Sequence, residues 1–448
     1  MGVARLPVSS ARSAAFEVLR RVEDRRGEPA SLLADPRYRS LSSADRDLAM
    51  EIVFGVLRWR ASLDWVLAHH ASRPLADLDT TVLLALRMGL YQIRHLDRVP
   101  DRAAVDESVR LAGAYGASRG KGLVNAVLRS VLRQPGVPPF PKKEEDPVDY
   151  LASALSHPRW LAERYVRRLG LERAEARCQA QDRTPPVHVR VSARVGVERA
   201  REALAGEGVE TEIVSGPPRC LRVLSGALSE SSLLRRGLVF TQDAGSQLVP
   251  LLLQVQRSDR VLDVCAAPGG KATAMSELAS EGSVIAIDRR RRRVRLLREI
   301  AERLQAKNVH PVVADGRSLP FEAKFARILL DVPCSSLGTL RRNPDVKWRV
   351  EVSDLERLAG LQLELLRSSS RLLTEDGRLV YATCSTEPEE NEQVVERFLS
   401  ESPGFRRVEP APSLPEPARH LVDADGFFRT SPEQDDMDGY FAAILVRR

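Results

Sequence analysis

The chain has 448 residues, of which 43% are hydrophobic and 29% are charged. These fractions are typical of folded globular proteins and exclude collagen-like and disordered chains, and at roughly 100 to 200 residues per domain the length predicts two or three domains. Residues 1–26 contain no continuous apolar core, and the apolar stretches elsewhere are short or interrupted, for example by Arg87. We therefore expect a cytoplasmic protein with no membrane partner.

Positive charge is concentrated near the N-terminal end. The formal net charge is +7, and most of it falls within residues 1–135. A basic module of this kind is typical of proteins that bind polyanions. Arginine is abundant throughout the chain, however, so compositional drift is the alternative, and charge alone favours a nucleic-acid partner only slightly.

The cysteines are far apart in the sequence. They are Cys178, Cys220, Cys265, Cys334 and Cys384. None belongs to a Cys-x-x-Cys pair and none has a His-x-x-x-His nearby, so we expect neither a metal site nor a disulfide framework. An isolated cysteine is usually a small buried hydrophobic residue, and each one needs a local reason before it is given a chemical role.

The first part of the chain is predicted to be helical. Apolar residues recur at helical spacing throughout residues 7–135, and Ser43 and Asp45 are plausible start signals for one helix. Residues 136–150 are rich in proline and charge and cannot continue a helix. The sequence therefore predicts an all-α domain at 1–135 followed by an interdomain linker at 136–150.

The pattern changes near residue 186. Short alternating strands, VHVRVS, VETEIV and CLRVLS, surround a helix at 197–206 and predict a small α+β domain, assigned to residues 151–240. From residue 241 to 448 strands alternate with helices, which predicts an open, mostly parallel, Rossmann-like α/β sheet with ligands at the carboxyl ends of its strands. The predicted fold class is therefore multidomain, with an all-α, a small α+β and an α/β domain.

The first predicted strand of the α/β domain runs into a loop of small residues that opens a helix. The loop consists of Cys265, Ala266, Ala267, Pro268, Gly269, Gly270 and Lys271. Small residues let the backbone approach a ligand closely, and a helix start favours an anion. Asp288 ends the next strand, where a carboxylate can accept hydrogen bonds from both hydroxyls of a ribose. Asp315 ends the third strand and would lie near a bound adenine.

Two other interpretations of this loop were weighed. A nicotinamide cofactor is disfavoured because Ala267 and Pro268 interrupt the Gly-x-Gly-x-x-Gly pattern. A purely structural tight turn is a fair alternative for the Gly-Gly pair. Lys271 favours a functional loop, because only seven of the 68 basic residues are lysines and a lysine here suggests a role that arginine cannot fill.

Two later strand ends carry cysteine, at Cys334 and Cys384, and Asp331 precedes the first of them. Both would lie at the carboxyl edge of the sheet beside the cofactor loop. Carbon 5 of a cytosine becomes a nucleophile only after a group adds to carbon 6, and a thiolate is well suited to that addition. Lys271 would help to form the thiolate. Asp331, kept partly protonated by burial, would supply a proton at ring nitrogen 3, and Cys334 or a water that it positions would assist removal of the carbon 5 proton.

The segments CAAPGGK, DVPCS and ATCS resemble the motifs of the RNA 5-methylcytosine methyltransferase family. The resemblance implies S-adenosylmethionine as the cofactor, held by residues 265–271, Asp288, Arg293, Asp315 and Asp331. It also implies that Cys384 is the nucleophile and that Cys334 assists release of the product. The residues alone leave these two roles open, because in DNA cytosine methyltransferases the cysteine after proline attacks.

Further segments extend the resemblance over nearly the whole chain. Residues 340–348 resemble a segment of the bacterial small-subunit ribosomal RNA branch, with Asn343 in place of the expected histidine, and Gln242–Ser246 is similar to the segment before the cofactor loop. Residues 7–135 resemble the helical, NusB-type RNA-binding domain. Ala272 departs from the family, where threonine or serine is common.

The resemblance implies methylation of a cytosine in 16S ribosomal RNA, either free or in a partly assembled subunit, and we expect a monomer. One alternative substrate is transfer RNA or a protein. The other alternative is a non-catalytic RNA-binding or regulatory protein on the same fold. That hypothesis is disfavoured because Cys384, Asp331 and the Pro-Gly-Gly turn are all retained.

Overall fold

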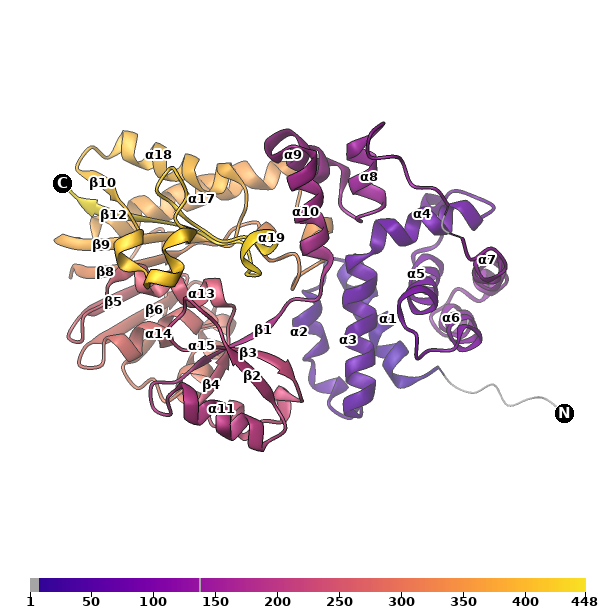
Figure 1. The fold of residues 1–448 in the computed structure, drawn as a ribbon, viewed down its shortest axis with the longest axis horizontal. Helices are drawn as coiled ribbons and strands as arrows, with labels where there is room; N and C mark the ends of the chain where they lie inside the picture. Colours follow the sequence, from indigo (N-terminus) through magenta and orange to yellow (C-terminus); the bar gives the residue numbers. More distant parts are fainter. Residues whose placement is uncertain (1–7, 137) are drawn as a thin grey trace. The chain divides into compact units, whose positions relative to one another are not determined.

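The computed structural model describes residues 8–136 and 138–448, so residues 1–7 of the predicted helical domain and Val137 of the predicted linker lie outside the described residues. The chain forms two compact units, traced by sequence colour in Figure 1. Unit 1 comprises the residues up to Arg183 together with Leu340–Arg349. Unit 2 comprises Thr184–Thr339 and Val350–Arg448.

Unit 1 is built from helices. They are α1 (Ser10–Glu23), α2 (Pro29–Leu33), α3 (Ser43–Arg58), α4 (Arg60–His70), α5 (Thr80–His95), α6 (Asp101–Ala114), α7 (Lys121–Arg133), α8 (Pro147–Ser153), α9 (Arg159–Leu169), α10 (Leu171–Asp182) and α16 (Val346–Arg349). Helices α1 to α7 bury one shared core, which includes Phe16, Ile52, Leu86 and Leu128. The helical periodicity predicted for residues 7–135 is therefore confirmed over the described part of that range.

Helix α3 begins at Ser43, one of the two predicted start signals, and Asp45 lies in its first turn. Ser42, not Ser43, caps the helix, because its hydroxyl accepts a hydrogen bond from the Asp45 backbone N–H at 3.1 Å and donates one to the Asp45 carboxylate at 2.9 Å. Adjacent serines give the same start signal in a sequence, and only the backbone conformation distinguishes them.

Arg87 interrupts the apolar face of α5 and is nevertheless buried. Its guanidinium donates two hydrogen bonds of 2.7 Å to the Asp64 carboxylate and one of 3.1 Å to Glu23. A buried charge that is paired in this bidentate manner avoids most of its desolvation cost. Among the described residues, no helix combines the length and the apolar character that crossing a membrane would require.

The boundary between the compact units lies between Arg183 and Thr184, beyond the predicted linker. The proline-rich segment at 136–150 interrupts the helices, but α8 then packs on α4, and the helices up to Arg183 group with unit 1. The first strand begins at Val187. Proline marks a break in regular structure and says nothing about which helices pack together.

Unit 1 also contains a segment from late in the sequence, Leu340–Arg349, which lies between β8 and α17 along the chain. Trp348 Nε1 donates a hydrogen bond of 2.6 Å to the backbone carbonyl of Leu57. Arg58 donates one of 3.0 Å to the carbonyl of Arg341. Two side-chain-to-carbonyl hydrogen bonds, one in each direction, therefore join this segment to the end of α3.

A buried ion pair holds the same segment. Lys347 is 1% exposed, and its Nζ lies 3.1 Å from Oδ1 of Asp182 at the end of α10. Burial lowers the pKa of Lys347 and raises the pKa of Asp182 to about 7, while the attraction between the two charges opposes both shifts. Such a pair is strongly destabilising when only one partner is removed.

Unit 2 contains two sheets, and the smaller one has the order β2-β3-β1-β4 with antiparallel neighbours. Its elements are β1 (Val187–Val191), α11 (Val197–Gly206), β2 (Glu210–Ile213), β3 (Cys220–Ser225), α12 (Ser232–Arg235) and β4 (Val239–Thr241). The three strands and the helix predicted here are confirmed. Strand β4 was not predicted, because three residues are too few to show alternation.

The larger sheet has the order β10-β12-β9-β8-β5-β6-β7, with β11 beside β12. Its strands are β5 (Arg260–Val264), β6 (Ser283–Asp288), β7 (Val309–Val313), β8 (Phe325–Asp331), β9 (Leu373–Thr383), β10 (Phe405–Val408), β11 (Phe428–Arg429) and β12 (Phe441–Arg447). Strands β5 to β9 run parallel to one another, and β12 is antiparallel to β9. This arrangement confirms the predicted α/β class.

Helices accompany both faces of this sheet. They are α13 (Ala244–Leu248), α14 (Gly270–Leu278), α15 (Arg291–Arg303), α17 (Val352–Arg371), α18 (Glu392–Glu401) and α19 (Pro432–Asp435). Leu329 of β8 packs in one core with residues of α14 and α15, whereas its neighbours Ile328 and Leu330 pack in another with α17 and α18. Because successive side chains of a strand face opposite sides, the central strands are apolar on both.

The strand order reverses direction between β5 and β8. The chain proceeds from β5 to β6 and β7 on one side and from β8 to β9 on the other, so helical connections diverge from this point. In open α/β sheets a ligand crevice forms at the carboxyl ends of the strands beside such a switch.

Candidate active site

Four parallel strands bring the predicted residues to one edge of the larger sheet. Strand β5 ends just before the 265–271 loop, β6 ends at Asp288, β8 ends at Asp331, and β9 ends directly before Cys384. The register places Asp331 opposite Ala382 of β9, and Val264 at the end of β5 opposite Leu330 of β8. Residues that are 51 and 66 positions apart in the sequence are therefore neighbours.

The 265–271 loop has a backbone that suits close approach of a ligand. Cys265 has a φ of 66° and Gly269 a φ of 113°, and a Cβ atom on Gly269 would lie 3.1 Å from Leu297. A non-glycine residue in the left-handed region, such as Cys265, is uncommon and often marks a functional site.

Arg293, at the start of α15, connects this loop with the end of β6. Its guanidinium donates a hydrogen bond to the carbonyl of Ala267 and lies 3.2 Å from Asp288 Oδ2. Asp288 Oδ1 accepts a hydrogen bond of 2.9 Å from the backbone N–H of Arg290. The structure therefore brings Asp288, Arg293 and the loop together.

Lys271, at the start of α14, pairs with Asp331. Its Nζ lies 2.8 Å from Asp331 Oδ2 and 5.3 Å from the ring centre of Tyr440. Burial alone would lower the pKa of Lys271, but the charge and hydrogen bond of Asp331 outweigh burial and raise it. Lys271 is therefore an ammonium ion at neutral pH. The expected burial of Asp331 differs from the structure, in which its side chain is 28% exposed and bound to this cation.

The sulfur atoms of Cys334 and Cys384 lie 3.3 Å apart, within hydrogen-bond distance, and both cysteines are free thiols. The hydrogen bond from Cys334 lowers the pKa of Cys384, and Ser336 at 3.5 Å and the charge of Lys271 add to this effect. The pKa of Cys334 is raised by the same hydrogen bond and by burial. Cys384 is therefore the member of the pair that ionises first.

Three family models match successive parts of the chain. Residues 9–133 match the NusB family, residues 157–228 match the ferredoxin-like domain of RsmF/B-like methyltransferases, and residues 250–446 match the 16S rRNA methyltransferase RsmB/F family. The probable ribosomal RNA small subunit methyltransferase B of Bacillus subtilis is 36% identical over 98% of this chain and 99% of its own length. The ribosomal RNA small subunit methyltransferase B of Cronobacter sakazakii is 33% identical over 98% of both chains.

The chain belongs to the RsmB/F family of 16S rRNA methyltransferases. Solved structures agree with this assignment. The crystal structure of PH0851 is 25% identical and covers 99% of this chain and 100% of its own, with a TM-score of 0.82. A methyltransferase homolog protein from Pyrococcus horikoshii is 26% identical over 67% of this chain and 98% of its own, with a TM-score of 0.57. The predicted family, fold class and enzyme class are therefore confirmed.

Two of the residues predicted for the RsmB/F site, Asp315 and Cys265, have surroundings that limit their roles. Asp315 follows β7, and its carboxylate is held by Arg317 at 2.7 Å. Hydrogen bonds from Arg317 lower the pKa of Asp315 to about 2. Cys265 belongs to the cofactor loop, but burial and then the charge of Asp288 raise its pKa to about 12. Cys265 therefore remains a thiol and contributes to the loop through its backbone and small size.

Asp263, the penultimate residue of β5, was not predicted from the sequence. Its side chain is fully buried, and its carboxyl oxygens have no hydrogen-bond partner in the part of the chain that the structure describes. Burial raises its pKa well above the ordinary value, and the charge of Asp331 raises it further. The sequence did hold a signal for this residue. Buried parallel strands are nearly continuous apolar runs, so a single acid within one is unusual.

The sequence analysis also missed Glu390, a fully buried carboxylate close to both cysteine loops. Its signal was weak, because it lies in an acidic segment, EPEENE, that would ordinarily be assigned to a solvated helix start.

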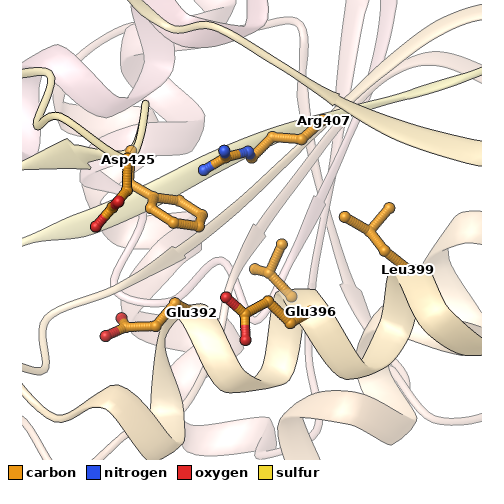
Figure 2. A pocket seen from close by; sticks show the side chains of 7 residues that line it. Glu392, Glu396, Leu399, Arg407 and Asp425 are labelled. Atoms are coloured by element: carbon orange, nitrogen blue, oxygen red, sulfur yellow. The ribbon is translucent and has the colours of Figure 1, made fainter.

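A pocket of about 340 Å³ lies elsewhere in this RsmB/F fold (Figure 2). Its lining residues are Glu392, Val395, Glu396, Leu399, Arg407, Asp425 and Phe427. Arg407 lies on β10, the edge strand of the larger sheet, and stacks over Phe427 at 4.0 Å. None of the predicted site residues lines this pocket, so we assign the chemistry to the carboxyl edge of the parallel strands.

Proposed function

We propose that this protein transfers a methyl group from S-adenosylmethionine to carbon 5 of a cytosine in 16S ribosomal RNA, through a covalent bond between Cys384 and carbon 6. The observation that carries the proposal is the thiol pair, with its Sγ atoms 3.3 Å apart, in which one pKa is lowered and the other raised. Addition needs a thiolate, and elimination benefits from a thiol beside the departing sulfur.

The residues present fit the proposed cofactor. S-adenosylmethionine carries an ammonium and a sulfonium group, and Asp263 offers a buried carboxyl group with no protein partner among the described residues. Asp288 and the 265–271 loop would hold the ribose and the adjacent part of the cofactor. When bound, the cofactor supplies an electrophilic methyl group.

The attack would be made by Cys384. Its thiolate adds to carbon 6 of a cytosine that has left its stack, because the reacting face is inaccessible within a helix. Negative charge then develops toward ring nitrogen 3. The Lys271–Asp331 pair would supply the hydrogen bond or proton there, with Lys271 as the donor and Asp331 orienting it.

Release would use Cys334. Once carbon 5 carries the methyl group, its remaining proton must leave to a base. Because the raised pKa keeps Cys334 a thiol, that base would be a water that Cys334 positions. The electron pair of that C–H bond re-forms the double bond between carbons 5 and 6, and the bond between carbon 6 and Cys384 breaks. Cys334 remains within hydrogen-bond distance of the departing sulfur.

The ribosomal substrate is supported by the relatives and by the helical unit. The relatives in Bacillus subtilis and Cronobacter sakazakii are described as small-subunit rRNA methyltransferases. Residues 9–133 match the NusB family and carry most of the net positive charge, which suits an RNA partner. All the residues used in this mechanism come from one chain, so a monomer suffices.

The experiment that tests this proposal is incubation of the full-length protein with labelled S-adenosylmethionine and 16S rRNA, followed by nucleoside analysis. We expect labelled 5-methylcytidine with the wild type and none with Cys384→Ala. Label in any other nucleoside, or labelling of transfer RNA in preference to 16S rRNA, would contradict the proposed product or substrate.

A further inference from the structure

Glu390 connects the two loops that carry the cysteines. It lies at the end of a short 3-10 helix, Pro388–Glu390, and is fully buried. Its Oε2 accepts hydrogen bonds of 2.5 Å from the hydroxyls of Ser335 and Ser385. These serines directly follow Cys334 and Cys384, so a single carboxylate oxygen bridges the residues next to both sulfurs.

The other carboxylate oxygen is also occupied. Oε1 accepts a hydrogen bond of 2.8 Å from the backbone N–H of Ser335 and one of 3.1 Å from the amide of Gln362. All four groups around the carboxylate are donors. Burial raises the pKa of Glu390, and these hydrogen bonds oppose that rise. An ionised carboxylate, which only accepts, matches this set of partners.

Further hydrogen bonds hold the Cys334 and Cys384 loops beside each other. The N–H of Gly338 donates a hydrogen bond of 2.9 Å to the carbonyl of Cys384, and a Cβ atom on Gly338 would lie 2.8 Å from that oxygen. The side-chain amide of Asn391, which follows Glu390, donates one of 2.9 Å to the carbonyl of Ser385 within the Cys384 loop. The two cysteine loops therefore meet along a shared, buried set of hydrogen bonds.

We propose that Glu390 is a positioning residue that keeps Cys334 within hydrogen-bond distance of Cys384. The proposal rests on the proposed function for the roles of the two cysteines. Glu390 itself contacts the neighbouring serines and neither sulfur, so it acts through the loops.

A purely electrostatic role makes the opposite prediction. The negative charge of Glu390 raises the pKa of Cys334, so removal of the charge alone would favour thiolates and speed thiol alkylation. If Glu390 positions the loops, its loss separates the sulfurs, Cys384 loses the hydrogen bond that lowers its pKa, and alkylation slows. Lys271, Asp331 and Tyr440, which also interact with Cys384, keep their charges in the variant. Ser336, which is hydrogen-bonded to Cys384 at 3.5 Å, follows Ser335 and belongs to the loop that Glu390 holds.

The test is the rate of iodoacetamide alkylation at Cys384 and Cys334 in the full-length protein, mapped by peptide mass across a pH range that spans the ordinary thiol pKa of about 8.5. Glu390→Gln removes the charge, and Glu390→Asp keeps the charge but shortens the reach. Glu396→Gln, at an exposed position of α18, is the matched control. We expect both Glu390 variants to slow Cys384 alkylation at neutral pH by roughly three- to tenfold, the loss of one hydrogen bond to a thiolate, and the control to match the wild type.

Faster or unchanged alkylation of Cys384 in a folded Glu390→Gln protein would overturn the proposal, and so would wild-type behaviour of Glu390→Asp. If Glu390→Gln does not fold, Ser385→Ala removes one of the bridging hydrogen bonds without changing the charge. We expect the same slowing of Cys384 alkylation in this variant. Alkylation at the wild-type rate would equally overturn the proposal. The assay needs neither RNA nor cofactor. A shift in alkylation without any RNA methylation would thus refute the proposed function and leave the positioning role in place.

Discussion

Cys334 and Cys384 are 50 residues apart in the sequence, and their sulfur atoms share a hydrogen bond of 3.3 Å at the carboxyl edge of one sheet. The pair arises because β8 and β9 are parallel neighbours. The hydrogen bond and the charge of Lys271 lower the pKa of Cys384, whereas the hydrogen bond and burial raise the pKa of Cys334.

The first prediction separates the roles of these cysteines. Cys384→Ala should abolish methylation and form no covalent species, because no thiolate remains to add to carbon 6. Cys334→Ala should permit addition and methyl transfer but slow release, and so leave a protein–RNA band that survives denaturing electrophoresis. The double variant should form no band. The opposite pattern, with the band in Cys384→Ala, would assign the attack to Cys334.

The second prediction concerns pH. Lys271 helps to lower the pKa of Cys384, so the thiolate persists to lower pH in the wild type than it would without this cation. Lys271→Met should move the acid limb of single-turnover methyl transfer to higher pH, with the loss largest on the acid side. Lys307→Met, at an exposed position, should leave the limb in place. An unshifted limb in Lys271→Met would remove Lys271 from thiolate stabilisation.

The third prediction concerns cofactor binding. Asp288→Ala should weaken S-adenosylmethionine binding in calorimetry by about 1.5 to 3 kcal/mol, the contribution of a hydrogen bond to a charged group. Asp315→Ala is the comparison, because the Asp315 carboxylate is already held by Arg317, and we expect a smaller loss. Equal affinity of Asp288→Ala and the wild type would contradict the assignment of the ribose site.

The fourth prediction concerns RNA binding by the helical unit. Arg73 and Arg119 are exposed and line a pocket of about 570 Å³ between loops of unit 1. If these arginines contact phosphates, replacing each with glutamine should weaken RNA binding and reduce the slope of affinity against salt by about 1 per contact. Arg102, which is paired with Asp106, provides a control of equal charge change. A slope unchanged by the Arg73 and Arg119 variants would place the RNA elsewhere.

The fifth prediction concerns the buried pair in unit 1. Lys347→Met leaves the Asp182 carboxylate buried without its cation and should destabilise unit 1 by about 3 to 5 kcal/mol. The double variant Lys347→Met with Asp182→Asn should recover much of this loss. Thermal unfolding of the single and double variants measures the coupling between the two residues. If the loss of stability in the double variant equals the sum of the losses in the single variants, the pair contributes no specific interaction.

Much of the fold followed from periodicity and from the order of strands. The helices of residues 10–133 showed the helical repeat, and a strand end bearing Asp288 or Asp331 implied a common edge, because parallel strands share one. Which serine caps α3 could not be predicted, since Ser42 and Ser43 differ only in backbone conformation.

The buried carboxylates were the harder part of the site. Asp263 and Glu390 become distinctive only when their surroundings are known, one by having no hydrogen-bond partner among the described residues and the other by having four donors. Likewise, Lys347 gives no sign in the sequence of its pairing with Asp182, because the two are 165 residues apart.

The chain crosses between its two units after Arg183, after Thr339 and after Arg349. Cutting once, at residue 183, would therefore not yield two independent halves. A fragment beginning at Thr184 would still carry Leu340–Arg349 as a loop whose Trp348 and Lys347 have lost Leu57 and Asp182. Supplied separately, the helical half should bind that loop as a receptor binds a peptide, so a synthetic peptide of residues 340–349 would compete with reassembly.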